Sequence, residues 1–302
     1  MSNQESAAAL MKGTGAIVLW VAALAAAGPA QAAPSVACRL ASAQRQSFDM
    51  QVPFDVIDGR IYVQARVNGR GPLKFAVDTG ASGLGRADSS LVASLGLQLE
   101  KPILNSDGVA TAEADTTTLN SLELGGLAKH DVKVITRDYN SRMSPEAAFS
   151  GIIAREFFAD GLLLIDYPRK VLSFSRSLSL SPEQPGALRY ERPFRVPVSI
   201  GAVSTEGNLD TGANVAFILP QVLFDQVSGT AAEAAGNGQL PNVQVETKRS
   251  TVHGPFRIGD VSVSDVEVRV SERYPELLVG AHTLQGFTVL IDQRSKSVAL
   301  CR

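Results

Sequence analysis

Two short stretches decide the fold predicted for this chain: "FAVDTGASGLG" at residues 75–85 and "GNLDTGANVAF" at residues 207–217. Each contains Asp-Thr-Gly-Ala after an apolar residue, and each stands at the end of a strand-like run. A single four-residue string in 302 residues carries a real risk of chance occurrence. Two copies in matching contexts predict two copies of one structural unit, which deliver Asp78 and Asp210 to a shared place.

The sequence around these strings repeats as well. The segment "LELGGLAKHDVKV" (122–134) matches "FRIGDVSVSDVEV" (256–268), and "LLLIDYPRKVLSF" (162–174) matches "TVLIDQRSKSVAL" (288–300). The copies begin 132, 134 and 126 residues apart, counted from 78 to 210, from 122 to 256 and from 162 to 288. Near-constant offsets in the same order predict an internal duplication with small differences in loop length.

The pattern inside each half is typical of strands. "IYVQARVNG" and "FRVPVSIG" place apolar residues at every second position and end on glycine. Only short helices are expected, at 87–97 after an N-cap candidate and at 220–227 after a proline. "SRSLSLSPEQPG" (175–186) is rich in Ser, Pro and Gly, which indicates a linker.

The sequence therefore predicts a mostly β protein with two lobes. With 45% hydrophobic and 19% charged residues, the chain can bury a core in each lobe. The predicted parts are an N-terminal segment at 33–49, the first lobe at 50–175, a linker at 176–187 and the second lobe at 188–302.

Residues 1–32 are expected to be a signal peptide. The apolar run "AIVLWVAALAAA" (16–27) is short for a membrane span, and it is followed by Gly-Pro and by small residues suited to cleavage. The mature chain would begin at Ala33, and Met11 is the expected start of translation. An uncleaved membrane anchor is the alternative. A cleaved signal peptide predicts an exported protein, periplasmic or secreted.

Export makes the two cysteines informative. Cys38 and Cys301 form an even pair that could bridge the ends of the mature chain in an oxidising compartment. Lipid attachment at Cys38 is the alternative, although Ser35 stands where such sites usually have leucine. The net charge of -2 offers no basic stripe for nucleic acid, and the Cys and His spacing suggests no metal site. We expect no nucleic-acid partner, no metal and no cofactor.

The residue types of Asp-Thr-Gly-Ala suit acid–base chemistry. Glycine lets the chain turn sharply after a strand, and threonine offers a hydroxyl that can tie one loop to its counterpart. Two such loops that meet would hold two carboxylates so close that they share one proton. That pair would supply a general acid and a general base in one site.

The two "DTGA" loops and the later stretches "GIIAREFF" (151–158) and "LLVGAHTL" (277–284) resemble the retropepsin-like aspartic proteases. The similarity spans nearly all of the mature chain, which resembles a fused version of the retroviral enzymes, as in exported bacterial members. The resemblance implies two retropepsin-like β lobes with the active site at their interface. It also implies a monomer whose chain ends run alongside each other.

The resemblance assigns roles to individual residues. Asp78 and Asp210 would be the catalytic pair that activates the attacking water. The site-supporting residues would be Thr79, Gly80, Ala81, Thr211, Gly212 and Ala213. The threonines would exchange hydrogen bonds between the loops, and the glycines would lie where substrate backbone passes. The implied function is an aspartic endopeptidase acting on an extended protein or peptide substrate.

Two positions depart from the family pattern, and they keep alternatives open. Ala154 stands where the family has glycine, and Ser82 replaces the acidic partner expected for Arg155. A catalytically silent peptide-binding module of the same fold is therefore one alternative. An enzyme for a non-protein amide such as a cell-wall peptide is another. The sequence argues against a serine hydrolase, because Leu84 stands where the nucleophile elbow requires glycine.

Two hairpins are expected to cover the substrate. One is predicted at 100–118 with a turn at Asp107-Gly108, and the other at 230–250 with a turn at Gly236-Asn237-Gly238. The alternative interpretation of both segments is a simple surface loop.

Overall fold

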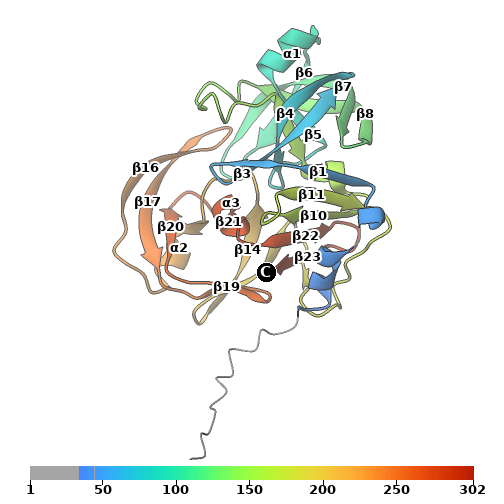
Figure 1. Cartoon of the computed structure of the whole chain (residues 1–302). Coiled ribbons are helices and arrows are strands. Elements are labelled where there is room, and N and C mark those ends of the chain that lie inside the picture. The colour runs from blue at the N-terminus through green and yellow to red at the C-terminus, as the bar shows by residue number, and fades with distance from the viewer. Residues whose placement is uncertain (1–33, 44) are drawn as a thin grey trace, which may run out of the picture. The chain divides into compact units, whose positions relative to one another are not determined.

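The computed structural model describes residues 34–43 and 45–302, so the expected signal peptide and its cleavage site lie outside the described residues. Pro34–Arg302 belong to one unit. Strands make up 51% of the structure and helices 10%, which confirms the mostly β prediction (Figure 1). Within this described part, no helix is long and apolar enough to cross a membrane.

The first Asp-Thr-Gly loop leaves an eight-stranded sheet formed by the first half of the chain. In chain order its strands are β2 (Asp55–Ile57), β3 (Arg60–Val67), β4 (Arg70–Asp78), β5 (Gly85–Asp88), β6 (Glu100–Ser106), β7 (Thr111–Leu124), β8 (Leu127–Arg137) and β9 (Gly151–Ala154). Across the sheet the order is β2-β3-β4-β9-β5-β8-β7-β6. The parallel neighbour of β4, which ends at Asp78, is therefore β9.

The second loop leaves a nine-stranded sheet formed by the second half. Its strands are β13 (Arg195–Ile200), β14 (Val203–Asp210), β15 (Phe217–Pro220), β16 (Glu233–Gln239), β17 (Gln244–Val252), β18 (Phe256–Ile258), β19 (Val261–Val263), β20 (Val266–Ser271) and β21 (Leu277–Gly280). Their spatial order is β16-β17-β20-β15-β21-β14-β13-β18-β19.

The centres of these two sheets have the same pairing pattern. The order β4-β9-β5-β8-β7 in the first corresponds to β14-β21-β15-β20-β17 in the second, with parallel and antiparallel neighbours alternating identically. Residues matched by the sequence repeat also share left-handed backbone angles. These pairs are Gly125 and Gly259, Asp131 and Asp265, and Lys170 and Lys296. Repeated sequence therefore builds the same local structure in both halves.

A third sheet contains strands from both halves. It consists of β1 (Met50–Pro53), β10 (Leu162–Asp166), β11 (Val171–Ser175), β12 (Leu188–Arg189), β22 (Thr288–Asp292) and β23 (Ser297–Cys301). The order is β1-β11-β10-β22-β23-β12, so β10 of the first half pairs directly with β22 of the second (Figure 1). The two halves are thus joined by continuous backbone hydrogen bonding.

The helical elements are short, as predicted. They are η1 (Ala37–Ser42), η2 (Arg45–Ser47), α1 (Ser89–Leu95), η3 (Arg155–Phe158), α2 (Gln221–Phe224) and α3 (Ala281–Leu284). Asp88 caps α1 by accepting a hydrogen bond from the Ser90 N–H, and Gly96 ends it with a φ of 63°. The helix expected at 220–227 is shorter than predicted and ends at Phe224.

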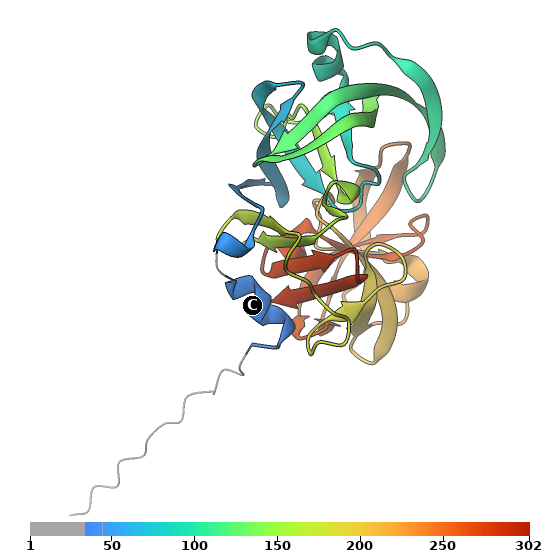
Figure 2. The ribbon, with the colours of Figure 1, turned by 90° about the vertical axis from the view of Figure 1, so that its right-hand side faces the viewer.

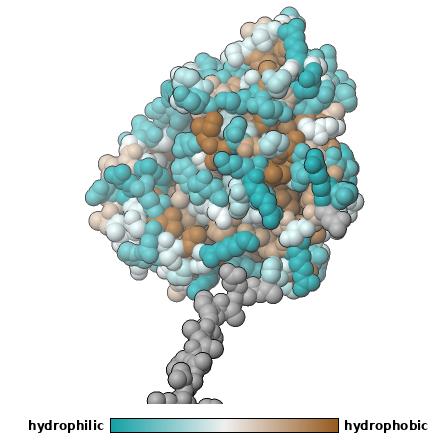
Figure 3. All heavy atoms as spheres, in the orientation of Figure 1, coloured by the Kyte–Doolittle hydropathy of each residue, from teal (hydrophilic) through white to brown (hydrophobic). Residues whose placement is uncertain are grey.

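The expected disulfide between Cys38 and Cys301 is present, with 5.5 Å between the Cα atoms. It ties η1 to β23, so the C-terminus lies beside the first described helix (Figure 2). A disulfide is compatible with an exported protein. The face seen in Figure 3 is mostly hydrophilic, with hydrophobic side chains gathered in small areas. This face offers no extensive apolar surface.

Candidate active site

Asp78 and Asp210 occupy equivalent positions at the ends of β4 and β14. Each ends a strand with a parallel neighbour, which pairs Asp78 with Ala154 and Asp210 with Gly280. A Cβ built on Gly280 would overlap the Val215 carbonyl oxygen and lie 2.9 Å from the Ala213 carbonyl oxygen. Ala154 is fully buried at the matching position. The first half therefore holds a methyl group where the second half has room only for glycine.

The threonines of the two loops exchange hydrogen bonds. The Thr79 N–H donates to Thr211 Oγ1 at 3.1 Å, and the Thr211 N–H donates to Thr79 Oγ1 at 3.0 Å. The hydroxyls in turn donate to the Leu209 and Val77 carbonyls of the opposite strands, at 3.2 and 2.9 Å. Both threonines are almost fully buried. Four buried hydrogen bonds therefore fix one loop against the other.

The glycines lie against the opposite carboxylates. A Cβ built on Gly80 would lie 2.5 Å from Asp210 Oδ2, and a Cβ built on Gly212 would lie 2.5 Å from Asp78 Oδ2. A side chain at either position would overlap the carboxylate from the other half. The two aspartates predicted from the sequence are thus brought together, each beside the loop that carries the other.

The carboxylates are electrostatically coupled. Burial, and then the negative charge of Asp78, raise the pKa of Asp210 to about 7, against the opposing effect of the Gly212 N–H. That N–H donates to Asp210 Oδ1 at 2.8 Å, and the Ala81 N–H donates to Asp78 Oδ1 at 2.9 Å. The site therefore favours a proton on Asp210.

Residues 63–157 match the aspartyl protease family model. The matched range begins in β3, ends in η3 and contains the first Asp-Thr-Gly loop with Asp78, but not Asp210. This match supports a protease-like function for the chain. No curated protein sequence matches the chain.

Two arginines hold the carbonyls of the glycines in the two loops. Arg155 Nη1 donates to the Gly80 carbonyl at 3.2 Å, and its Nε pairs with Glu156 at 3.1 Å. Arg155 thus has an acidic partner, although Ser82 cannot supply one. On the other loop, Arg60 Nε donates to the Gly212 carbonyl at 2.7 Å. The glycine carbonyl of each loop therefore accepts a charge-assisted hydrogen bond from an arginine.

Arg60 comes from the first half and reaches across to the second loop. Its Nη2 donates to Asn214 Oδ1 at 3.1 Å, and the Asn214 amide donates to Asp58 Oδ2 at 2.5 Å. His282 Nε2 lies 3.3 Å from Asp58 Oδ1. No motif marks Arg60 or Asn214 in the sequence, because their contact depends on how the two halves meet.

The hairpin of β6 and β7 turns where it was predicted. The Asp107 N–H donates to the Ala110 carbonyl at 3.1 Å, and Gly108 has a φ of 89°. The Asp107 carboxylate also accepts from the Val109 and Ala110 N–H groups at 3.0 and 2.8 Å. The Asp107-Gly108 turn is therefore confirmed.

The turn predicted at Gly236-Asn237-Gly238 is wrong. These residues lie inside β16, next to a register shift between Ala234 and Asn237 in its pairing with β17. The chain reverses at residues 240–243, where the Leu240 N–H donates to the Val243 carbonyl at 2.9 Å. Pro241 is well suited to the second position of such a turn, whereas glycine inside a strand is compatible with a bulge.

The tips of the two hairpins are in contact. The Asn242 N–H donates to Asp107 Oδ2 at 2.7 Å, and its side-chain amide donates to the Asn105 and Ala110 carbonyls at 2.7 and 2.9 Å. Arg137 Nη1 donates to Asn242 Oδ1 at 2.7 Å. Asn242 therefore docks one hairpin into the turn of the other.

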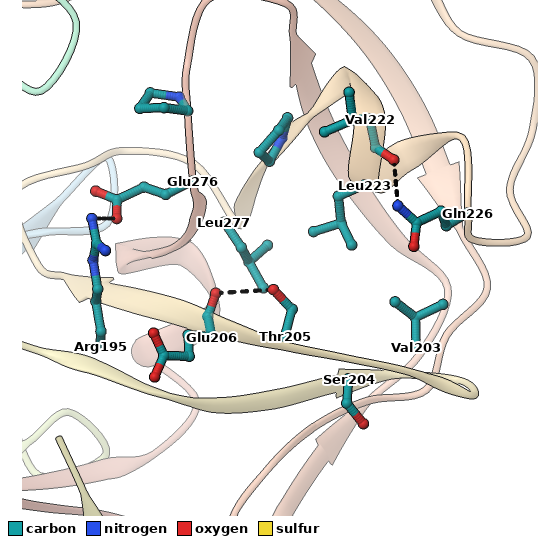
Figure 4. A pocket seen from close by; sticks show the side chains of 12 residues that line it. Arg195, Val203, Ser204, Thr205, Glu206, Val222, Leu223, Gln226, Glu276 and Leu277 are labelled. Carbon is teal, nitrogen blue, oxygen red and sulfur yellow. Dashed lines mark hydrogen bonds and ion pairs between the residues drawn. The ribbon is translucent and has the colours of Figure 1, made fainter. Parts of the chain in front are cut away.

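A cavity of about 520 Å³ lies along β14, the strand that carries Asp210 (Figure 4). Val203 and Leu223 contribute apolar lining, and Arg195 pairs with Glu276 at one end. Neither aspartate lines this cavity. It is therefore a feature of the second half, separate from the aspartate pair.

Proposed function

We propose that this protein is an aspartic endopeptidase that hydrolyses peptide bonds in an extended protein or peptide substrate. The observation that carries the proposal is the arrangement of Asp78 and Asp210. Their loops exchange four hydrogen bonds through the threonines, and each carboxylate lies against the glycine of the opposite loop. Paired carboxylates that share one proton suit general acid–base hydrolysis.

The raised pKa of Asp210 favours that residue as the holder of the shared proton. In the proposed reaction Asp210 donates this proton to the carbonyl oxygen of the scissile bond. Asp78, its partner, removes a proton from the attacking water. The product of this step is a tetrahedral diol, with no covalent enzyme intermediate.

The proposed enzyme is a two-lobed, retropepsin-like protein that arose by internal duplication. The matched sheet centres, the repeated sequence and the shared left-handed residues support this origin. Because one chain supplies both aspartates, we propose that it acts as a monomer, with the site at the lobe interface. We further propose that it is exported to the periplasm or secreted, which agrees with the disulfide.

The activity should have a bell-shaped pH profile. As pH rises through about 7, Asp210 loses the proton that it must donate, so kcat/KM should fall. At low pH the pair binds a second proton and the base is lost, so kcat/KM should fall again. The measurement digests a peptide library with the purified chain lacking residues 1–32, and then follows one cleaved peptide from about pH 3 to about pH 9.

We expect the alkaline limb of the kcat/KM profile to lie near pH 7. Chelators and serine-directed reagents should leave the cleavage activity unchanged, and a statine-type diol mimic should inhibit it. Binding of peptides without any cleavage across the pH range would instead favour the silent binding module. Cleavage of cell-wall peptides, without cleavage of the peptide library, would indicate that the substrate is a non-protein amide.

Replacing Gly212 by Ala should lower kcat/KM at least about a hundredfold, because misplacing a reacting group by about 1 Å costs that much. The added methyl group would overlap the Asp78 carboxylate, which must then move. Gly286→Ala is the matched control, since its nearest new contact is an ordinary 3.6 Å to the Thr283 carbonyl. Equal kcat/KM for the two variants would contradict the close approach of Gly212 and Asp78.

A further inference from the structure

A row of side chains crosses the first sheet on the face that carries Asp78. Ala76 lies two residues before Asp78 on β4, so the two side chains point to the same face. The register of the neighbouring strands extends this row in both directions. From β3 to β8 it consists of Tyr62, Ala76, Ile152, Arg86 and Ile135.

The second sheet has a matching row, counted from Asn208, two residues before Asp210. From β13 to β20 it consists of Arg195, Asn208, Leu278, Ile218 and Arg269. Arg86 therefore corresponds to Ile218. The same position is filled by an apolar residue in one half and by a cation in the other, so the fold itself does not require a charge there.

Arg86 is half-buried, and much of its hydrogen-bonding capacity is unused. Its Nη1 donates to the Gly85 carbonyl at 3.0 Å, and its Nη2 reaches Ser82 Oγ at 3.4 Å. Guanidinium has five N–H groups, so three remain without a partner among residues 34–43 and 45–302. No carboxylate in this described part of the chain forms an ion pair with it.

The surroundings of Arg86 leave its guanidinium only partly hydrated. Burial lowers its pKa, while Tyr139 and Asp78 act in the opposite direction. Arg137 lies on the next strand, two residues beyond Ile135 and on the same face, but its Nη1 is already bound to the tip of the second hairpin. A half-buried guanidinium with free donors can bind a carboxylate through two parallel hydrogen bonds.

We propose that Arg86 forms a subsite for the carboxylate of an acidic side chain in the peptide substrate. The proposal rests on the proposed peptidase function and names its substrate class: extended peptides with Asp or Glu at the position that passes Arg86 beside Asp78. The second sheet, with Ile218 at the matching position, has no equivalent subsite. Recognition of the acidic residue is therefore confined to one side of the scissile bond.

The test compares two pools of octapeptides with blocked termini, randomised at every position but one. The defined residue is Glu in the first pool and Gln in the second. Separate pairs of pools place it at each position of the peptide in turn. Cleavage is measured with the wild-type chain lacking residues 1–32. Retention is measured separately on the Asp210→Asn variant, so that recognition can be followed without turnover.

At one position the Glu pool should be cleaved and retained about ten- to a hundredfold better than the Gln pool, the range expected for a hydrogen-bonded charge pair. Arg86→Ile, which copies the residue of the second half, should reduce this ratio to about one. Arg86→Lys should keep an intermediate ratio, because lysine retains the charge but loses the planar fork. Arg257→Ile removes an exposed arginine from β18, which pairs with β13 and β19 at the far side of the second sheet, and should leave the ratio unchanged.

The outcomes separate this proposal from the peptidase function. Cleavage of both pools at equal rates would overturn the acidic subsite and leave the peptidase standing. If the Glu pool were retained better than the Gln pool, this preference were lost in Arg86→Ile, and neither pool were cleaved, the acidic subsite would stand and the peptidase function would be wrong. A Glu preference that persists in Arg86→Ile, or that arises only from peptides with a free C-terminal carboxylate, would also overturn the proposal.

Discussion

Replacing Asp78 by Asn, or Asp210 by Asn, should each lower kcat/KM of the proposed peptidase by at least about a thousandfold. Asparagine has the shape of aspartate but cannot cycle a proton. The Asp78→Asn variant would have no base for the water, and the Asp210→Asn variant would have no acid for the carbonyl oxygen. Because the two carboxylates act as one unit, the double variant should be about as inactive as either single variant.

The loss should be chemical and not structural. A group whose folded pKa is raised stabilises the fold at a pH below its unfolded pKa, and this contribution is lost as pH rises through the folded pKa of about 7. Asparagine does not titrate, so the Asp210→Asn variant does not lose this stability as pH rises. It should therefore be at least as stable as the wild type at about pH 8. Its peptide binding should persist.

Asp260→Asn provides the matched control for both variants, because it makes the same substitution at an exposed residue in the turn between β18 and β19. It should retain the activity of the wild type. If both single variants in the site kept a substantial part of the wild-type kcat/KM, the assignment of Asp78 and Asp210 as the catalytic pair would be wrong.

Removing the disulfide should lower the free energy of unfolding by about 5 to 6 kcal/mol, as the chain-entropy treatment gives for so long a loop. The bond joins residues that are 263 positions apart, so it closes almost the entire described chain. The change is Cys38→Ala together with Cys301→Ala. Urea unfolding of the oxidised wild type and of the double variant measures the difference.

The reduced wild-type protein is the control for the loss of the two sulfur atoms. It keeps both cysteine side chains without the bond, so its stability should match that of the double variant. A difference of less than about 1 kcal/mol between oxidised and reduced protein would mean that the unfolded chain gains little freedom when the bond is broken.

The sequence predicted the features that depend on local pattern. Alternating apolar residues indicated strands, and the N-cap at Asp88 and the turn at Asp107-Gly108 have local chemical causes. The repeat around Asp78 and Asp210 predicted that two aspartates would meet, because two like units commonly pair through like surfaces. These inferences needed no knowledge of strand register.

The contacts that the sequence did not reveal depend on distant segments. Arg60 reaches Gly212 across 152 positions, and Asn242 reaches Asp107 across 135. Arg86 became notable only when the register aligned it with Ile218. The second hairpin turn was misplaced because glycine is common both in turns and in strand bulges, and only the pairing with β17 distinguishes the two.

The pairing of β10 with β22 determines which parts of this molecule can serve as a gate. Five residues of each strand are paired, so separating the two halves would break backbone hydrogen bonds in the middle of a sheet. The hairpin tips are held instead by a few polar contacts of Asn242, each contributing about 1 kcal/mol. In the proposed peptidase, substrate would therefore enter by movement of the hairpins, while the aspartate pair keeps its geometry.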